Sequence, residues 1–285
     1  MSESDTPRRP GPWDPRPEDI AAKPAATEPT RTQAAEPPLH KGQNPVLALA
    51  STLLLGGLIW YLSDSWVIAV ALIWGLFIHE YGHVLAMNRL GMGPARIHII
   101  PFFGGAAVSQ RLPQSEWHGV LVSLAGPAFG LLAAIPWFAG FIITRQPEWL
   151  VGAAVIAAVN LINLAPAPPL DGSKALGPVL ARIHPLLEQL AMLAVGALIL
   201  WWAFMTGRMF LVVFLAIALI GHMKRGVRRP EGRPLSGRES VFSVVLFLAT
   251  AVACAAVGIA ALMPLGGGSL PVALGIAAQE LGIAR

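Results

Sequence analysis

The feature that most constrains this chain is a series of apolar blocks, each about as long as the hydrocarbon core of a bilayer. A helix needs roughly 20 apolar residues to cross that layer. Only 13% of the 285 residues are charged, against about 25% in a typical soluble domain. The sequence therefore predicts an all-α polytopic membrane protein with about seven transmembrane helices. The predicted segments are 45–62, 66–89, 117–143, 149–164, 186–205, 208–224 and 240–263.

Residues 1–44 differ from the rest, because their nine prolines, six Lys or Arg and seven Asp or Glu cannot bury a core. We expect a disordered cytoplasmic tail over 1–44, a transmembrane domain over 45–264 and a short C-terminal tail over 265–285. The C-terminal tail is too short and interrupted to cross a membrane, so we expect it at the outer interface or loosely ordered.

The distribution of positive charge predicts the orientation of the chain. With the N-terminus in the cytoplasm, that side receives six Lys or Arg in the tail and eleven in the predicted loops 89–116, 171–185 and 224–239, against three on the other side. This is the asymmetry of the positive-inside rule. The formal net charge of +4 therefore indicates topology and not nucleic-acid binding. We expect a multi-pass protein of a cell membrane, and from its compact architecture a prokaryotic plasma membrane.

Three ionisable side chains, His79, Glu80 and His83, lie inside the apolar segment 66–89. Histidines four residues apart project from one face of a helix. The H-E-x-x-H pattern is typical of zinc hydrolases, in which both histidines bind the metal and the glutamate is the general base. An ionisable group at mid-bilayer costs roughly 2.5–3.5 kcal/mol, so such groups usually face a functional cavity. We therefore predict one Zn²⁺ per chain.

Two histidines leave a tetrahedral zinc short of a third protein ligand. Asp171 is the clear candidate, because it follows an apolar segment in the stretch NLINLAPAPPLDGSK (160–174). In the predicted topology it arrives at the same side of the membrane as the histidines. The prolines of this stretch cannot continue a helix, and irregular backbone at that depth is tolerated only against protein or a wet cavity.

HEYGH (79–83), together with NLAPAPPLDG (163–172) further along the chain, resembles the paired motifs of the site-2 protease family of intramembrane zinc metalloproteases. SLAGPAFG (123–130) is similar to a further family segment. The chain looks like a compact version of the family, without a recognisable PDZ or CBS domain.

The resemblance implies that His79, His83 and Asp171 are the zinc ligands, that Glu80 is the general base toward zinc-activated water, and that Asn163 helps to hold the substrate or to shape the site. It also implies an endopeptidase that cleaves transmembrane segments in regulated intramembrane proteolysis, for example in an anti-sigma factor or a membrane-tethered regulator.

A membrane-associated β-hairpin is predicted over 96–112, next to the zinc site. Two β-prone runs flank Gly104-Gly105, which we interpret as a two-residue turn, and Pro101 favours an edge position for the first run. A free edge can pair with an extended peptide, so Gly104 and Gly105 are predicted to bind substrate. A cytoplasmic linker with glycines in tight turns is the alternative.

Two other classes of function stay open. A metal transporter would use the His/Asp cluster as a transit site, although the chain shows no paired repeat of the kind such proteins contain. A catalytically silent scaffold would bind membrane segments, but it has no need of Glu80. The expected partners are a transmembrane-helix protein substrate and the lipid bilayer, with no nucleic acid; a regulatory membrane partner or a homo-oligomer stays open.

Overall fold

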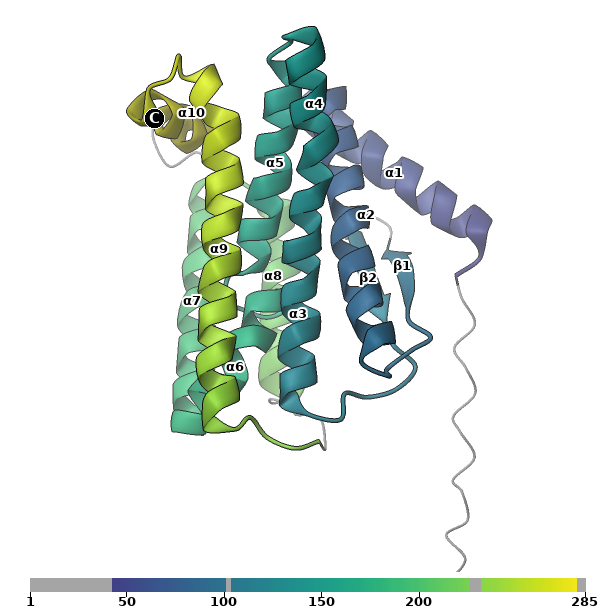
Figure 1. Ribbon diagram of the computed structural model, residues 1–285, viewed down its shortest axis with the longest axis vertical. Helices are drawn as coiled ribbons and strands as arrows, with labels where there is room; N and C mark the ends of the chain where they lie inside the picture. The colour runs from purple at the N-terminus through teal and green to yellow at the C-terminus, as the bar shows by residue number, and fades with distance from the viewer. Residues whose placement is uncertain (1–42, 101–103, 226–231, 281–285) are drawn as a thin grey trace, which may run out of the picture. The chain divides into compact units, whose positions relative to one another are not determined.

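The structure, a computed structural model, describes residues 43–100, 104–225 and 232–280. Helices dominate these ranges, together with one two-stranded sheet (Figure 1). The predicted disordered tail lies outside the described residues except for its last two positions. The elements are α1 (Pro45–Ser63), α2 (Trp66–Arg89), β1 (Arg96–Ile100), β2 (Gly104–Val108), α3 (Glu116–Gly130), the 3₁₀ turn η1 (Leu131–Ala134), α4 (Ile135–Thr144), α5 (Glu148–Asn163), α6 (Asp171–Ile183), α7 (Pro185–Met205), α8 (Met209–Arg225), α9 (Gly237–Leu265) and α10 (Leu270–Glu280).

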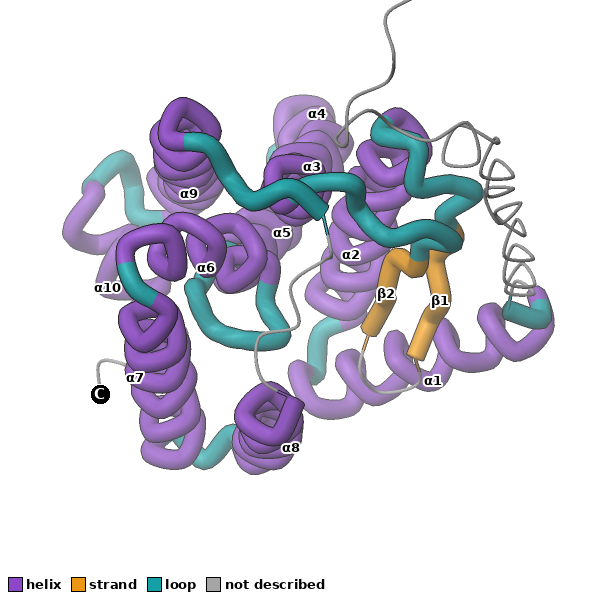
Figure 2. Tube along the Cα trace, turned by 90° about the horizontal axis from the view of Figure 1, so that it is seen from below, coloured by secondary structure: helices purple, strands orange, loops and turns teal. Residues whose placement is uncertain are grey.

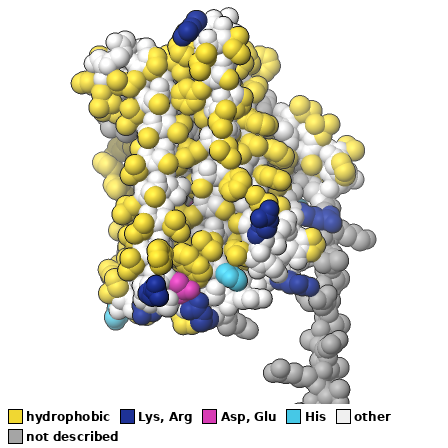
Figure 3. All heavy atoms as spheres, viewed as in Figure 1, with side chains coloured by type: hydrophobic (Ala, Val, Ile, Leu, Met, Phe, Trp, Pro, Cys, Tyr) yellow, Lys and Arg dark blue, Asp and Glu magenta, His cyan; other side chains and the backbone are white. Residues whose placement is uncertain are grey.

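Five helical stretches of the described residues are long and apolar enough to cross a membrane. They are α1, α2, α7, α9 and the continuous path Glu116–Thr144 through α3, η1 and α4. The apolar helix α5 is shorter, and the predicted segment 208–224 is also helical, as α8. Figure 3 shows hydrophobic side chains over most of the visible face, with charged side chains gathered at the end where α3 and α9 begin. The helical membrane fold is confirmed, whereas a count of seven spans is not.

One predicted loop is a helix. The prediction that 171–185 is a loop is wrong, because the helix α6 occupies most of this stretch. The helix is too short and too polar to be recognised as a span, yet it is amphipathic: Ala175, Gly177 and Ala181 are buried while Lys174 is exposed. The buried side packs against α3, α7 and α9. The predicted C-terminal tail is likewise helical in part, as α10.

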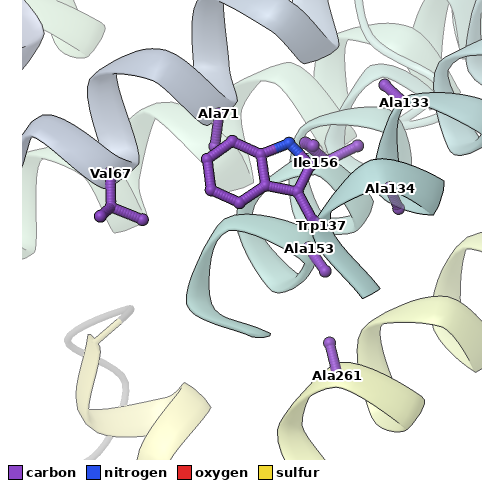
Figure 4. Packing of buried hydrophobic residues seen from close by; sticks show 8 residues of the cluster. All are labelled: Val67, Ala71, Ala133, Ala134, Trp137, Ala153, Ile156 and Ala261. Atoms are coloured by element: carbon purple, nitrogen blue, oxygen red, sulfur yellow. The ribbon is translucent and has the colours of Figure 1, made fainter. Parts of the chain in front are cut away.

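The helix core forms where α2, α5 and α9 meet the η1–α4 corner (Figures 2 and 4). The Trp137 ring, only 5% exposed, lies among Ala71 of α2, Ile156 of α5 and the alanines of η1. A Cβ at Gly152 of α5 would overlap this ring, so the glycine leaves the space that the indole fills. Small residues at such contacts are typical of membrane helices, since they let backbones approach closely.

The predicted hairpin is present, but its turn is not where we expected it. Strands β1 and β2 pair antiparallel with Ile99 opposite Gly105, and the link 101–103, including Pro101, lies outside the described residues. Gly104 and Gly105 are the first residues of β2 and not the turn. Tertiary packing explains why glycine is found in the strand. The sheet packs on α2, and a Cβ at Gly105 would lie only 2.7 Å from Cγ of Glu80.

The contact between α2 and α3 is the most extensive between any two helices described. Gly82 stands at its centre, where a Cβ would lie 2.5 Å from the carbonyl oxygen of Ala125 and 2.7 Å from Cβ of Phe129. Because a backbone atom is one of the obstacles, no rotamer change can relieve the overlap.

We predict that Gly82→Ala destabilises the folded protein by about 1–3 kcal/mol, the usual cost of overpacking, because the added methyl group separates α2 from α3. Thermal unfolding in detergent measures the effect. Gly119→Ala on α3 is the matched control, since a Cβ there meets nothing within 4 Å and the helix gains about 0.5–1 kcal/mol from replacing glycine. Equal unfolding temperatures for the two variants would contradict the packing argument.

Candidate metal centre

Three predicted ligands from two distant parts of the chain meet in the interior. His79 and His83 project from α2, and Asp171 begins α6. The Nε2 atom of His79 lies 3.0 Å from Oδ2 of Asp171, the Nε2 atom of His83 lies 3.2 Å from the same oxygen, and the two Nε2 atoms are 3.1 Å apart. All three side chains are buried, so the structure places three potential ligand atoms around one point.

The hydrogen bonds of the other ring nitrogens determine which tautomer each histidine adopts. His83 Nδ1 donates to the carbonyl oxygen of Val122 on α3 at 2.7 Å. His79 Nδ1 donates to Oδ1 of Asn160 on α5 at 2.9 Å, and Nδ2 of that amide donates to the Ile156 carbonyl, which fixes its orientation. Carbonyl oxygens only accept hydrogen bonds, so both Nδ1 atoms carry the proton. Each ring therefore directs its Nε2 atom toward Asp171, where it can serve as a metal ligand.

This donor set fits a zinc ion. Two imidazole nitrogens and a carboxylate oxygen are ligands that zinc accepts, and two lone pairs beside a carboxylate repel one another unless a cation or a proton lies between them. Ligand atoms held tetrahedrally at about 2.0–2.1 Å from zinc lie about 3.3 Å from one another, close to the 3.0–3.2 Å observed. A second partner for each histidine is also typical of metal sites.

Gly126 of α3 leaves the space for these rings. A Cβ at this position would lie 2.9 Å from Nε2 of His79 and closer still to Nε2 of His83. Pro127 follows it inside the helix and is fully buried. The SLAGPAFG segment therefore forms one wall of the metal centre.

Asp171 reaches the centre because α5 ends at Asn163 and a proline-rich segment turns the chain into α6. The expectation that these prolines interrupt the helix is confirmed. A carboxylate in the first turn of a helix is favoured by the helix dipole. The Nζ atom of the exposed Lys174 lies 3.9 Å from the other carboxylate oxygen of Asp171, Oδ1, whereas both histidines contact Oδ2.

Glu80 faces a cavity beside the metal centre. The cavity has a volume of about 750 Å³ and lies between α1, α2 and the sheet. Its lining is apolar apart from Glu80 and Thr52, and Glu80 is its one ionisable residue. The Glu80 side chain is 7% exposed, and Gly105 of β2 packs directly against it.

Asn163 and Asn160 have different surroundings. The Asn163 amide, predicted to hold substrate, donates to the Val159 carbonyl of its own helix and is half-buried. Asn160, which the sequence analysis did not select, is fully buried against His79. A signal was present, since a polar residue in the middle of an apolar helix often faces a functional site. Gly104 contacts Leu76 of α2 instead of Glu80.

Comparison with known proteins shows what the part of the chain that carries the histidine pair is similar to. The sequence profile of peptidase family M50 matches residues 67–157. The chain is also 32% identical over 139 residues to a protein of Synechocystis sp. named "Putative zinc metalloprotease sll0528", a match that covers 46% of this chain and 35% of that relative. The chain thus spans about a third of the length of the relative. No solved structure matches it significantly.

The matched range holds the histidine pair, Glu80 and Gly126, whereas Asn160 and Asp171 lie beyond it. The resemblance read from the paired motifs is confirmed, because residues 67–157, which hold the HEYGH motif, are similar to peptidase family M50, the site-2 protease family.

Proposed function

We propose that this membrane protein is a zinc endopeptidase that cleaves within the transmembrane segments of other membrane proteins. The observation that carries the proposal is the convergence of His79, His83 and Asp171 next to Glu80, which lines a cavity. A transporter needs a site that releases its ion. Here each histidine is held by a second buried partner, which suits a retained metal better.

The chain's own residues have distinct roles in this proposal. Zn²⁺ held by His79, His83 and Asp171 would supply a Lewis acid that polarises the scissile carbonyl and lowers the pKa of water. Glu80 is the general base: it takes a proton from the attacking water and delivers it to the leaving amine. Two observations support this role: Glu80 follows His79 directly in the chain, and it lines the cavity.

The cavity suits an apolar polypeptide. Its walls include Trp60 of α1 and Trp74 and Phe77 of α2, and these rings can pack against a transmembrane segment. A helix must unwind before its amide can be attacked. We propose that the unwound segment pairs with the sheet beside Gly104 and Gly105, since strand addition uses the backbone groups that unwinding frees. We propose that Asn163, at the end of α5, contacts the same segment.

The orientation also belongs to the proposal. We place seven spans in a prokaryotic plasma membrane with the N-terminus in the cytoplasm. The ends of α2 and α5 and the start of α6, which carry the site, would then lie in the cytoplasmic half. Cleavage at that depth suits release of a regulator, such as an anti-sigma factor or a membrane-tethered transcription factor, into the cytoplasm.

We predict that Glu80→Gln keeps one zinc per chain but lowers cleavage of a co-expressed single-span substrate at least a hundredfold, because general-base catalysis contributes about 10²–10⁴. Elemental analysis measures the metal, and gel analysis of the substrate measures cleavage. Gln146→Ala, on an exposed residue between α4 and α5, controls for expression. Persistent cleavage by the Glu80→Gln protein would remove this residue from the mechanism.

We predict that Gly126→Ala lowers zinc affinity at least tenfold, because the new methyl group occupies the space beside both Nε2 atoms. The measurement is competition with a zinc chelator of known affinity, which does not depend on activity. Gly119→Ala changes the same helix where a Cβ has free space and serves as the control. A normal zinc affinity in the Gly126→Ala protein would place the metal elsewhere.

We predict that Asn160→Ala weakens zinc binding about 10–100-fold, as loss of an outer partner of a ligating histidine usually does, because His79 Nδ1 loses its acceptor. Asn163→Ala is the matched comparison. It should leave zinc affinity unchanged, since that amide bonds only to its own helix among the described residues, and should raise KM if it contacts substrate. Equal zinc affinities for the two variants would contradict the role of Asn160.

A further inference from the structure

A single glutamine side chain occupies the outer edge of β1. The Ile99 N–H donates to Oε1 of Gln43 at 2.7 Å, and Nε2 of Gln43 donates to the Ile99 carbonyl oxygen at 2.8 Å. One primary amide thus bonds both backbone groups of one strand residue. This is the pattern that a residue of a neighbouring antiparallel strand would make.

These two bonds also determine which way the backbone of β2 points. Ile99 is paired with Gly105, and because its own N–H and C=O point outward to Gln43, this pair is of the non-hydrogen-bonded kind. The polar backbone groups of Gly105, and of Ala107 two residues further on, therefore point to the opposite, outer edge of β2. Among the described residues none bonds them.

The two edges differ in their distance from the catalytic machinery. Gly105 packs against the Glu80 side chain, so a chain paired with β2 lies one strand spacing, about 4.8 Å, from the residue that touches the base. A chain paired with the outer edge of β1 lies roughly 10 Å from Gly105, with β1 in between. Only the outer edge of β2 places an extended backbone within reach of Glu80.

We propose that Gln43 closes the outer edge of β1, so that an extended substrate polypeptide pairs only with the outer edge of β2 at Gly105 and Ala107. This inference rests on the proposed endopeptidase function and adds to it a residue that positions the substrate. Open strand edges pair readily with other chains, and a two-stranded sheet has two of them. Because Gln43 occupies the outer edge of β1, only the outer edge of β2, beside Glu80, is left for an extended polypeptide.

The position of Gln43 suits this role. Asn44, the next residue, caps α1 through a hydrogen bond from the Val46 N–H to its Oδ1 atom. The backbone that carries Gln43 is therefore fixed by the start of a membrane helix, and α1 itself packs against β1. The amide is held at the edge by a rigid element, as an internal substitute for a strand requires.

Disulfide cross-linking tests which edge takes the polypeptide. The probe is a synthetic single-span peptide with a Leu/Ala span, a central Asn-Pro break and one cysteine beside the break. The protein carries Glu80→Gln and one new cysteine, either Ile97→Cys on β1 or Ala107→Cys on β2. These residues are paired across the sheet, so they report on opposite edges. The native Cys254 is buried in α9.

With Gln43 present, we expect the cross-linking yield at position 97 to be less than a tenth of that at position 107. Gln43→Ala should raise the yield at position 97 at least fivefold, and so should Gln43→Met, which keeps the side-chain volume but lacks both hydrogen bonds. Gln146→Ala should not change it. A loss of folding would lower both yields and would not transfer labelling from one edge to the other.

Equal yields at the two positions with Gln43 present, no gain at position 97 in either variant, or cross-linking at neither position would overturn the inference. Cleavage of the same peptide without its cysteine, by the protein with Glu80 intact, is measured in parallel. Failure of cleavage with zinc bound would overturn the proposed function. Intact cleavage with the wrong labelling pattern would overturn only the role of Gln43.

Discussion

The structure depends on three potential metal ligands being held together in the interior of the helices. His79, His83 and Asp171 are buried within about one ligand spacing of one another. In a medium of low polarity such a cluster is strongly unfavourable unless a cation or protons neutralise it. The surrounding helices therefore act as a frame: α3 and α5 each accept a hydrogen bond from one histidine ring, and α6 carries the carboxylate.

The frame requires α3 to approach α2 very closely, and glycines make this approach feasible. Gly82 of α2 meets the α3 backbone, Gly126 of α3 faces the histidine rings, and Gly130 of the same helix leaves room for the Asn160 amide. In a bilayer, association of helices relies on such close packing because lipid tails are as apolar as leucine. The packing that holds the membrane helices together and the shape of the metal centre are thus the same set of contacts.

The sequence predicts the parts of this site that depend on local spacing. The i,i+4 histidines need only a helix, and Asp171 stands out because acids are rare in so apolar a chain. The sequence does not show that Asn160, and not Asn163, bonds to His79. That depends on which face of α5 packs against His79, which only the tertiary structure determines. The helix α6 was missed because Gly177 and Pro178 interrupt a short amphipathic pattern. Likewise, the diglycine at 104–105 has the composition of a turn, and packing against α2 places it in a strand instead.

The geometry of α2 explains why a membrane enzyme of this design would need a sheet. Successive residues of a helix are rotated by about 100°, so Glu80 points about 100° from His79, whereas His83 points only about 40° from it. The residues of α2 that line the cavity, such as Ala69, Ile73 and Phe77, point about 80–160° from His79, so Glu80 lies on the histidine side of this arc. The metal centre and the cavity therefore occupy neighbouring faces of one helix, and Glu80 stands where the faces meet. In the proposed function a polypeptide in the cavity would approach the metal centre past Glu80, and β2, packed against Glu80 through Gly105, is the element that runs beside this residue.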